Sequence, residues 1–526
     1  MTVDSVSAEN LQPLPKLSTV NYQLSTKSGM QPKIYILLFF IVALTGCNKP
    51  ITSLSAQTLH ATSLQKKFSL EELEHRTFNW FWDLVDKNYQ VPDRHPTRQF
   101  SSIAATGFGL TAYCIGVERH YVTRIQAAER VLKTLQFLLN APQGAAQSGV
   151  TGFHGFYYHF LDHENGTRYK DVELSTIDTG LLMAGVLSVM SYFDSNDATE
   201  IAIREVAEKL YRRVEWDWFQ NLNKNLSMGY HPENGFIKAE WIGYNEAMVL
   251  LIIAIGSPTH PIDASAWQRW CKPYKWDTFY GQEHVNFDPL FGHQYSQMYI
   301  DFKGIQDSFM RAKGIDYFDN SRRATLANRA YCIANPQKYK NYSANEWGLT
   351  ACDGPGDELR NEEVKKLRNG KDTTFIFSRK FMGYSARGAA STNIVDDGTI
   401  APTAVGGSLP FAPEVCLPAL ENMWNKYYDT LVTEYGFKDA YNVTYNFEPL
   451  TLSNEPSRNS AQSSKLKAQS LNGWVDKDYL GIDQGPIIIQ IENYRSQFVW
   501  KLMRKNPYIV AGLKKSGFKN GWIDNR

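Results

Sequence analysis

The chain carries almost no net charge. Lysine and arginine together number 55 and aspartate and glutamate 54, so the formal net charge of the 526 residues is +1. Proteins that bind nucleic acid or another polyanion carry a basic surplus, so this balance argues against such a partner. The sequence also contains no phosphate-cradling glycine loop, nucleophile elbow or dinucleotide-binding fingerprint. We therefore predict no cofactor.

Cysteine is scarce as well. Of the six cysteines, Cys47 lies near the N-terminus, and the other five include no CxxC pair. Neither a disulfide framework nor a zinc site is expected, because both require characteristic spacings. Cys332 and Cys352 could pair across a loop, although a small buried hydrophobe is the default for each cysteine. The histidines of the segment HGFYYHFLDH, 154–163, alternate with other residues and favour a hairpin over a metal site.

Aromatic residues, by contrast, are abundant. They make up 13% of the chain and include 13 Trp and 29 Tyr. The C–H faces of sugar rings stack on such side chains, while Asp, Glu, Asn and Gln bind sugar hydroxyls. A large helical core would also use Trp and Phe as filler. Neutral glycans are nevertheless the partner class that composition favours.

The N-terminal region has the pattern of a bacterial lipoprotein signal. Lys33 is followed by the apolar run 34–44, which is too short for a bilayer span of about 20 residues but suits a signal-peptide core. The run ends in Leu-Thr-Gly-Cys47, where signal cleavage would leave a lipidated cysteine. We predict a signal segment over 1–47 with its true start at Met30, a polar tether over 48–66, and a protein lipid-anchored in the bacterial cell envelope, in the periplasm or at the outer membrane.

Helical patterns dominate the rest of the chain. Ser69 and Glu72 have capping-box spacing and open an aromatic helix. Within 123–140, one face of a helix would carry Ile125, Ala128, Leu132, Leu135 and Leu139. Further helices are predicted over 101–119, 176–193, 198–215, 244–256, 321–334, 412–433 and 484–504. An all-α architecture with functional loops at one end follows.

Two segments depart from the helical pattern. The run 156–162, the turn HENG and the run 167–175 predict a β-hairpin before a helix that Ser175 opens. Residues 443–478 are polar and rich in serine and asparagine, so we predict an exposed insertion there.

Acids and aromatics gather at residues 236–261, FIKAEWIGYNEAMVLLIIAIGSPTHP. The run from Ala247 is too apolar for a solvent-facing helix, so it would be buried on all sides and hold Glu246 near its N-terminal end. A desolvated carboxyl has a raised pKa, as a general acid requires. The helix dipole alone could also favour an acid in the first turn. Acids and aromatics together suggest sugar chemistry.

Several long segments resemble one known family. They are FGHQYSQMYIDFKGIQD (291–307), RATLANRAYCIANP (323–336), WGLTACDGPG (347–356), DDGTIAPTA (396–404) and YLGIDQGPIIIQIENYRSQFVWKLM (479–503). They are similar to the glucoamylase-like family of bacterial (α/α)6 proteins, with the β-1,2-glucanases of glycoside hydrolase family 144 as the closest relatives. The resemblance extends over nearly all of the chain after about Phe68. It implies an (α/α)6 toroid over 67–526.

The resemblance also implies site residues. Glycoside hydrolysis needs two acids on opposite sides of the scissile bond. Glu246 is the candidate general acid, and Glu173, Asp178 or Asp483 would be the base or bind the reactive sugar. Asp178 and Asp483 could instead serve helix caps. The candidates for substrate binding are Trp241, Tyr244, Glu240, Gln294, Tyr295, Asp301, Trp347, Asp353 and Asp397, with Asp396 beside them.

The function implied is hydrolysis of a β-glucan, with endo-β-1,2-glucanase activity that releases sophoro-oligosaccharides by inversion as the first hypothesis. An exo-acting hydrolase of β-1,2-gluco-oligosaccharides or a transglycosylase is the alternative within the family. A non-catalytic, glycan-binding surface lipoprotein is the alternative from another class. We expect a monomer whose partners are its glucan and, through Cys47, the membrane.

Overall fold

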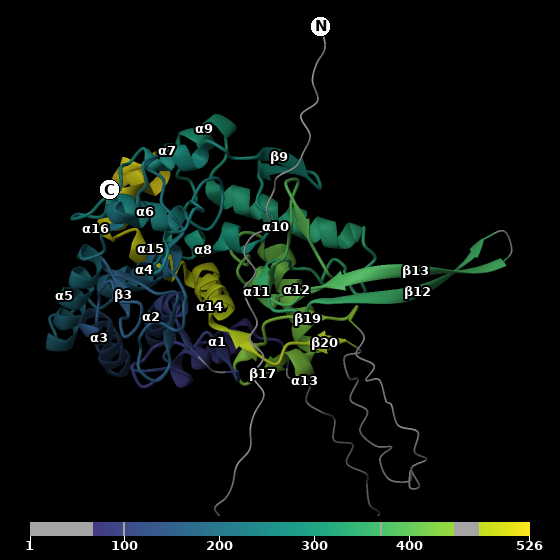
Figure 1. The fold of residues 1–526 in the computed structure, drawn as a ribbon, viewed down its shortest axis with the longest axis horizontal. Coiled ribbons are helices and arrows are strands. Elements are labelled where there is room, and N and C mark those ends of the chain that lie inside the picture. Colours follow the sequence, from purple (N-terminus) through teal and green to yellow (C-terminus); the bar gives the residue numbers. More distant parts are fainter. Residues whose placement is uncertain (1–66, 98–99, 369–370, 446–472) are drawn as a thin grey trace, which may run out of the picture. The chain divides into compact units, whose positions relative to one another are not determined.

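The computed structural model describes residues 67–97, 100–368, 371–445 and 473–526 (Figure 1). These residues belong to one compact unit, Leu64–Arg526. The predicted signal and tether, 1–66, lie outside the described residues, as does the stretch 446–472 of the predicted insertion. Among the described residues, no helix is both long and apolar enough to cross a membrane.

An inner layer of helices is buried on nearly every side. Neighbouring helices of this layer contact one another, the last packs on the first, and a side-chain hydrogen bond joins the fourth to the fifth, so the described part of the chain forms a closed ring. Gln294 helps to close it by donating a hydrogen bond to the Ala404 carbonyl at 2.8 Å. The inner helices are α2 (Ile103–Glu118), α4 (Thr176–Tyr192), α6 (Met248–Gly256), α8 (Phe291–Tyr299), α11 (Pro402–Gly406) and α14 (Gly481–Ser496).

The outer helices are amphipathic and cover this ring. Outer and inner helices alternate along the chain, which confirms the predicted all-α (α/α)6 toroid. The longer outer helices are α1 (Leu70–Asp83), α3 (Arg124–Asn140), α5 (Ala198–Arg212), α10 (Tyr317–Ala334), α12 (Pro413–Lys426) and α16 (Pro507–Lys515). Shorter ones are α7 (Ala266–Cys271), α9 (Ser308–Lys313), α13 (Tyr428–Leu431) and α15 (Phe498–Met503).

The sequence explains the two layers. Every residue of α6 is buried, as its unbroken apolar sequence predicts. Where α2 crosses α4, the backbones touch at two glycines: a Cβ on Gly107 would lie 2.7 Å from the Leu182 Cα, and one on Gly185 would lie 2.1 Å from the Gly107 carbonyl oxygen. Such close packing of two inner helices requires residues without a side chain.

Some predicted helix details are wrong. Ile125 is 72% exposed, because the buried face of α3 runs through Ala128, Val131 and Leu135. The predicted helix 244–256 begins only at Met248. The predicted helix 484–504 is broken at Gln497, whose left-handed conformation (φ 59°) separates α14 from α15.

Short strands connect the helices at their ends. The paired strands are β1 (Arg94–His95) with β21 (Tyr479–Leu480), β2 (Phe100–Ser102) with β5 (Phe160–Asp162), β3 (Gly152–Phe153) with β4 (Phe156–Tyr157), β6 (Leu174–Ser175) with β7 (Gly229–His231) and β8 (Gly235–Phe236), β9 (Trp276–Phe279) with β10 (Gln282–Val285), β11 (Ala351–Cys352) with β14 (Ser385–Ala386), β12 (Glu358–Arg368) with β13 (Lys371–Phe381), β15 (Gly388–Ala389) with β16 (Ile394–Val395), β17 (Val432–Thr433) with β18 (Gly436–Phe437), and β19 (Tyr441–Asn442) with β20 (Trp474–Val475).

The predicted hairpin within 156–175 forms only in part. Its two arms meet at the isolated bridges Tyr158↔Leu174 and Leu161↔Arg168. Each arm takes its longer pairing elsewhere, β5 with β2 and β6 with β7. The long hairpin of the structure is instead β12–β13, which projects from the helices (Figure 1).

The end of the predicted insertion is also packed rather than exposed. β20 pairs with β19, and Asp476 and Asp478 behind it are 5% and 2% exposed. The predicted C-terminal boundary of the insertion, residue 478, is therefore too late. The sequence of this segment resembles a loop because its buried side chains are polar.

Candidate active site

Glu246 lies just before the first turn of α6. Its backbone carbonyl accepts a 2.7 Å hydrogen bond from the Ser296 hydroxyl, which ties it to α8. Burial raises the pKa of Glu246 to about 7, and the nearby charge of Asp178 adds to the rise. The predicted position at the mouth of an apolar helix is therefore confirmed, and the carboxyl can hold a proton near neutral pH.

His159 connects two further predicted acids. Its Nδ1 lies 2.8 Å from Glu173 Oε1, and its Nε2 lies 3.6 Å from Asp178 Oδ1. Burial disfavours the charged ring, but the carboxylates of Asp178 and Glu173 outweigh it and raise the pKa of His159 to about 9. Burial alone would raise the pKa of Glu173, but the hydrogen bond and charge of His159 hold that pKa at about 2. His159 and Glu173 thus form an ion pair at neutral pH.

Asp178 has both a capping and a site position. Ser175 is the N-cap of α4, and its hydroxyl accepts from the Asp178 N–H at 3.2 Å, as the capping-box spacing predicts. The Asp178 carboxylate also accepts from the Ser175 hydroxyl and faces His159. Burial raises the pKa of Asp178, whereas His159 lowers it. The helix-cap and active-site interpretations are therefore compatible.

Asp483 lies in the first turn of α14 and forms a carboxyl pair with Asp439. It is not the N-cap, because the helix already begins at Gly481. Burial raises its pKa to about 7; a hydrogen bond from Asp439 counteracts the rise, and the charges of Asp353 and Asp93 add to it. Burial and the charge of Asp483 raise the pKa of Asp439 well above its usual range. The two carboxyls therefore share a proton, which lies on Asp439 when Asp483 is ionised.

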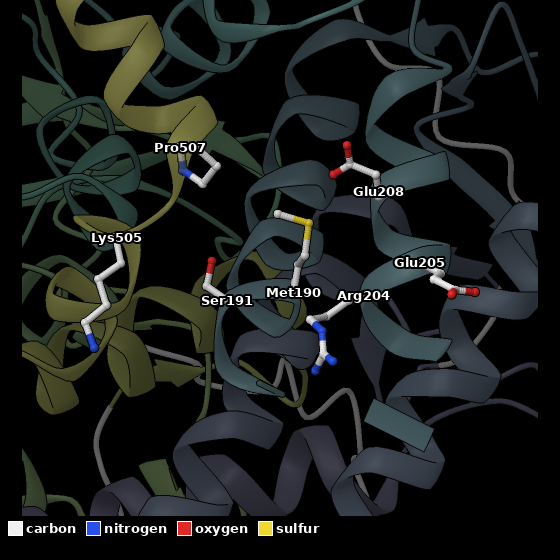
Figure 2. Close-up of a pocket in the computed structure, with 7 residues that line it drawn as sticks. All are labelled: Met190, Ser191, Arg204, Glu205, Glu208, Lys505 and Pro507. Atoms are coloured by element: carbon white, nitrogen blue, oxygen red, sulfur yellow. The ribbon is translucent and has the colours of Figure 1, made fainter. Parts of the chain in front are cut away.

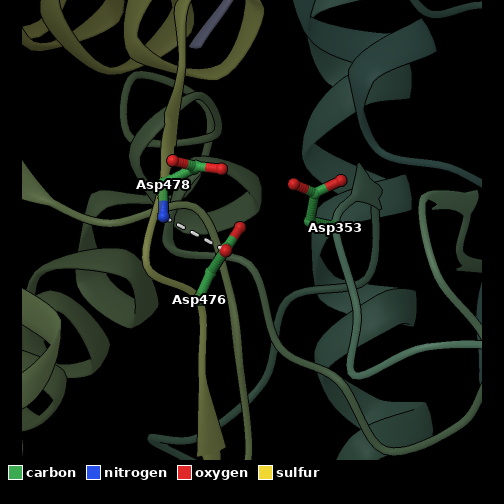
Figure 3. A group of neighbouring side chains, drawn as sticks. All are labelled: Asp353, Asp476 and Asp478. Atoms are coloured by element: carbon green, nitrogen blue, oxygen red, sulfur yellow. Dashed lines mark hydrogen bonds between the residues drawn. The ribbon is translucent and has the colours of Figure 1, made fainter. Parts of the chain in front are cut away.

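A second acid group adjoins this pair. Carboxylate oxygens of Asp353, Asp476 and Asp478 all lie within 4.8 Å of one another (Figure 3). Arg94 supplies positive charge, with its Nη1 2.7 Å from Asp353 Oδ2 and 4.0 Å from Asp478 Oδ2. Burial raises the pKa of Asp476 to about 8, followed by the charge of Asp439. The Arg94 guanidinium and the protonated Asp476 carboxyl reduce the net negative charge of this group.

The acids around His159 and the acids around Asp483 belong to one site. Asp93 lies between them: its backbone carbonyl accepts from the Gly481 N–H at 2.7 Å, at the start of α14, and its charge acts on both His159 and Asp483. The Tyr295 hydroxyl lies 3.5 Å from the carbonyl of Ile482, in the fields of Asp483 and Glu246. Predicted acids from α4, α6 and α14 thus meet where the N-terminal ends of these inner helices come together.

The predicted aromatic binding residues are mostly buried. Trp347 is fully buried, so it offers no ring face to a sugar in this structure. Trp241 is 7% exposed and donates its indole N–H to Thr176, while Tyr244 is 5% exposed and contacts His293. Tyr295 is 6% exposed. These rings fix the walls of the site, and their role in binding a sugar stays a prediction.

Several predicted polar binding residues have structural partners instead. Both carboxylate oxygens of Glu240 accept from asparagines, Asn221 and Asn225. Gln294 is buried and bound to α11. Asp301 follows the C-terminal end of α8 and pairs with Arg504, so it lies at the other end of α8 from the acids.

Asp397 also has a core position. Its carboxylate is fully buried and binds the Arg387 guanidinium through two contacts of 2.8 Å. The neighbouring Asp396 accepts from the hydroxyls of Tyr331 and Tyr342. Among the predicted acids of these loops, Asp353 is the one that reaches the site.

Six participants of the site were not predicted from the sequence: His159, Asp93, Arg94, Asp439, Asp476 and Asp478. The alternation around His159 was visible, but its partners came from separate elements. β1 brings Arg94 beside Leu480, immediately before α14, and a hydrogen bond from the Asp353 N–H to Asp439 at 2.7 Å joins residues 86 positions apart. No local spacing signals such pairs.

A surface hollow lies away from these acids. It has a volume of about 470 Å³ and lies between the last turns of α4, α5 and the start of α16 (Figure 2). Met190 and Ser191 of α4 line it, and Met190 is twelve residues beyond Asp178, which corresponds to about 18 Å along a helix.

The five cysteines of the described residues are buried and free, so Cys332 and Cys352 do not pair.

Comparison with known proteins identifies the family. A sequence profile of the Glycoamylase family matches residues 238–507. The chain belongs to this family. A crystal structure of a Bacteroides uniformis protein that carries a glucoamylase name is 30% identical, with a TM-score of 0.70 over 87% of this chain and 99% of that one. The predicted family resemblance is confirmed.

Two relatives of this Glycoamylase-family chain have named activities. An endo-β-1,2-glucanase from Chitinophaga pinensis, in complex with sophorotriose and glucose, is 27% identical with a TM-score of 0.68 and matches 86% of this chain and 100% of its own. An exo-β-1,2-glucooligosaccharide sophorohydrolase from Parabacteroides distasonis is 26% identical over 88% of this chain. The chain spans 59% of the length of the Parabacteroides protein.

Proposed function

We propose that this Glycoamylase-family protein is a glycoside hydrolase that cleaves internal bonds of β-1,2-glucan and releases sophoro-oligosaccharides. The observation that carries the proposal is a protonatable carboxyl, Glu246, that shares one site with the ionised acid Glu173 and the carboxyl pair Asp439–Asp483. Glycoside hydrolysis needs one protonated and one ionised carboxyl. The near-neutral charge of the chain suits an uncharged glucan.

Glu246 would act as the general acid. Its pKa of about 7 leaves a proton on the carboxyl at neutral pH, and donation to the glycosidic oxygen would let the bond break. The anchor from Ser296 holds its backbone in place while the side chain remains partly exposed.

Asp483 is the base that the hydrogen bonds favour. Glu173 is paired with His159, and its pKa of about 2 makes it a weak base. Asp178 is bound by Ser175 and His159. Asp483 receives a hydrogen bond from protonated Asp439, so it ionises first of the two and could take a proton from a water molecule. Attack of that water on the face opposite the leaving oxygen would invert the anomeric centre.

An exo-acting hydrolase is the second candidate, because the Parabacteroides relative is named as one. Endo action is preferred because the match to the endo-acting relative covers 100% of that protein.

A linkage and product analysis tests the proposal. Purified residues 48–526 are incubated with linear β-1,2-, β-1,3-, β-1,4- and β-1,6-glucans. We expect reducing sugar from β-1,2-glucan alone, with a ladder of early products and with inverted anomers by NMR. Sophorose as the sole early product would support exo action, and retained anomers would overturn inversion. Binding without hydrolysis of any glucan would identify a glycan-binding protein.

We also propose that the protein is held in the cell envelope by lipid on Cys47. The support is the short apolar run 34–44 followed by Leu-Thr-Gly-Cys, which lies outside the described residues. Polymeric glucan would then meet the enzyme outside the cytoplasm.

A further inference from the structure

Tyr384 is an exposed aromatic ring next to the acids. It lies in the three-residue connection between β13 and β14, and 51% of its surface is open to water. The predicted aromatics Trp241, Tyr244, Tyr295 and Trp347 are 7% exposed or less. The ring of Tyr384 therefore has a face available to a ligand, whereas the four predicted rings do not.

Backbone pairing fixes the position of Tyr384 opposite Asp353. β14 pairs antiparallel with β11 so that Ser385 faces Cys352. The residue before Ser385, Tyr384, therefore lies across from the residue after Cys352, Asp353, which binds Arg94. Its phenol also lies in the fields of Asp483, Asp439 and Asp93, which come from three separate parts of the chain.

The connection that carries Tyr384 is held rigidly by Arg387. This fully buried guanidinium donates to the carbonyls of Met382 at 2.9 Å and Gly383 at 3.1 Å, the two residues before Tyr384. The same guanidinium donates to the Cys352 carbonyl at 2.8 Å, next to Asp353. The buried Arg387 side chain thus fixes the backbone positions of both Tyr384 and Asp353.

A rigid, exposed ring over a group of acids is the arrangement that binds a sugar. The ring face would take the C–H face of a pyranose, and the acids around it would accept hydrogen bonds from hydroxyls. Because Arg387 already holds the connection that carries Tyr384, little conformational freedom is lost on binding.

We propose that Tyr384 forms a glucosyl-binding subsite, in which its ring stacks on one glucose unit while Asp353 binds the hydroxyls of that unit. This inference rests on the proposed function and extends it, since it assigns a binding role to a residue outside the proposed catalytic groups. The subsite strengthens binding of the glucan and leaves the proposed catalytic residues unchanged.

The variants Tyr384→Ala and Tyr384→Phe test the proposal, with Tyr494→Ala as a matched control. Tyr494 is an exposed tyrosine, at 39%, near the C-terminal end of α14, eleven residues or about 16 Å along the helix from Asp483. Hydrolysis kinetics are measured on β-1,2-gluco-oligosaccharides of graded length, and binding is measured by retardation in gels that contain β-1,2-glucan. Thermal melts check that each variant is folded.

We expect Tyr384→Ala to raise KM about two- to tenfold, the range of an aromatic contact, with kcat nearly unchanged and retardation reduced. Tyr384→Phe keeps the ring and should lie close to wild type, as should Tyr494→Ala. Wild-type KM and retardation in folded Tyr384→Ala would overturn the subsite. So would an equal loss in Tyr494→Ala.

The two proposals can fail separately. If the wild-type protein cleaves another glucan, the proposed linkage is wrong, and the same KM comparison on that glucan judges Tyr384. If it cleaves β-1,2-glucan and Tyr384→Ala behaves as wild type, only the subsite is wrong. A wild-type protein that neither binds nor cleaves any of the four glucans overturns both.

Discussion

His159 holds Glu173 through a 2.8 Å contact between its Nδ1 and the carboxylate, and its other ring nitrogen faces Asp178. The charge of this imidazolium keeps Glu173 ionised and opposes the rise that burial causes in the pKa of Asp178. This arrangement separates the protonation states of neighbouring carboxyls, which acid–base catalysis requires.

The ion pair predicts a pH-dependent stability. The pKa of His159 is raised from 6.5 to about 9 in the folded state, so its contribution is fully present below pH 6.5 and is lost as the pH rises through 9. We expect the melting temperature to fall over this window, and less in His159→Gln. Identical profiles for wild type and His159→Gln would refute the ion pair.

The pH profile of hydrolysis should report Glu246. Its pKa of about 7 predicts that kcat/KM declines as the pH rises through 7, because the acid loses its proton. The charge of Asp178 contributes to that raised pKa, so Asp178→Asn should move the decline to lower pH. The measurement is the residual activity of the variant between pH 5 and 9. A decline that stays in place would show that Asp178 does not act on the acid.

Asp397 should matter for stability rather than for substrate. Asp397→Asn leaves the buried Arg387 without its counter-charge, so we expect a loss of about 3 to 5 kcal/mol in the free energy of unfolding. Asp396→Asn is the matched control: Tyr331 and Tyr342 donate to different oxygens of Asp396, and the amide keeps an acceptor for one of the two hydroxyls, so it should cost about 1 kcal/mol. Denaturant titration measures both. Normal stability with weakened glucan binding would instead restore Asp397 to the substrate site.

Cys47→Ser tests the lipid anchor. Without the thiol, the chain cannot be lipidated, so the variant should leave the membrane fraction and appear in the soluble fraction. Fractionation and immunoblotting measure the shift. Unchanged membrane association would refute the proposed anchor.

Local patterns predicted much of the helical fold. Ser69 and Ser175 cap their helices where the spacing indicated, and the apolar run of α6 is buried as expected. The break at Gln497 had no local signal, since glutamine is an adequate helix former; contacts of Trp500 with Asn493 and Gln297 favour it. The charged sequence of β12 shows no apolar alternation that could have announced a strand.

The site was predicted less completely, for a physical reason. Glu246, Asp178 and Asp483 lie at the starts of inner helices. The apolar helix pattern located Glu246, whereas the family resemblance pointed to Asp178 and Asp483. Asp93 and Asp439 lie in loops and gain their roles only from residues distant in sequence. The predicted aromatics were chosen for their ring type, but exposure decides whether a ring can stack, and exposure depends on tertiary packing.

Glu246→Gln tests the central claim most directly. The amide keeps the size of the side chain but cannot donate a carboxyl proton to the leaving oxygen. We predict that hydrolysis of β-1,2-glucan, measured as reducing ends released, falls about 10²- to 10⁴-fold while gel retardation by the glucan persists. Glu240→Gln, whose carboxylate is held by Asn221 and Asn225, should retain most activity. Near-normal hydrolysis by Glu246→Gln would contradict the account.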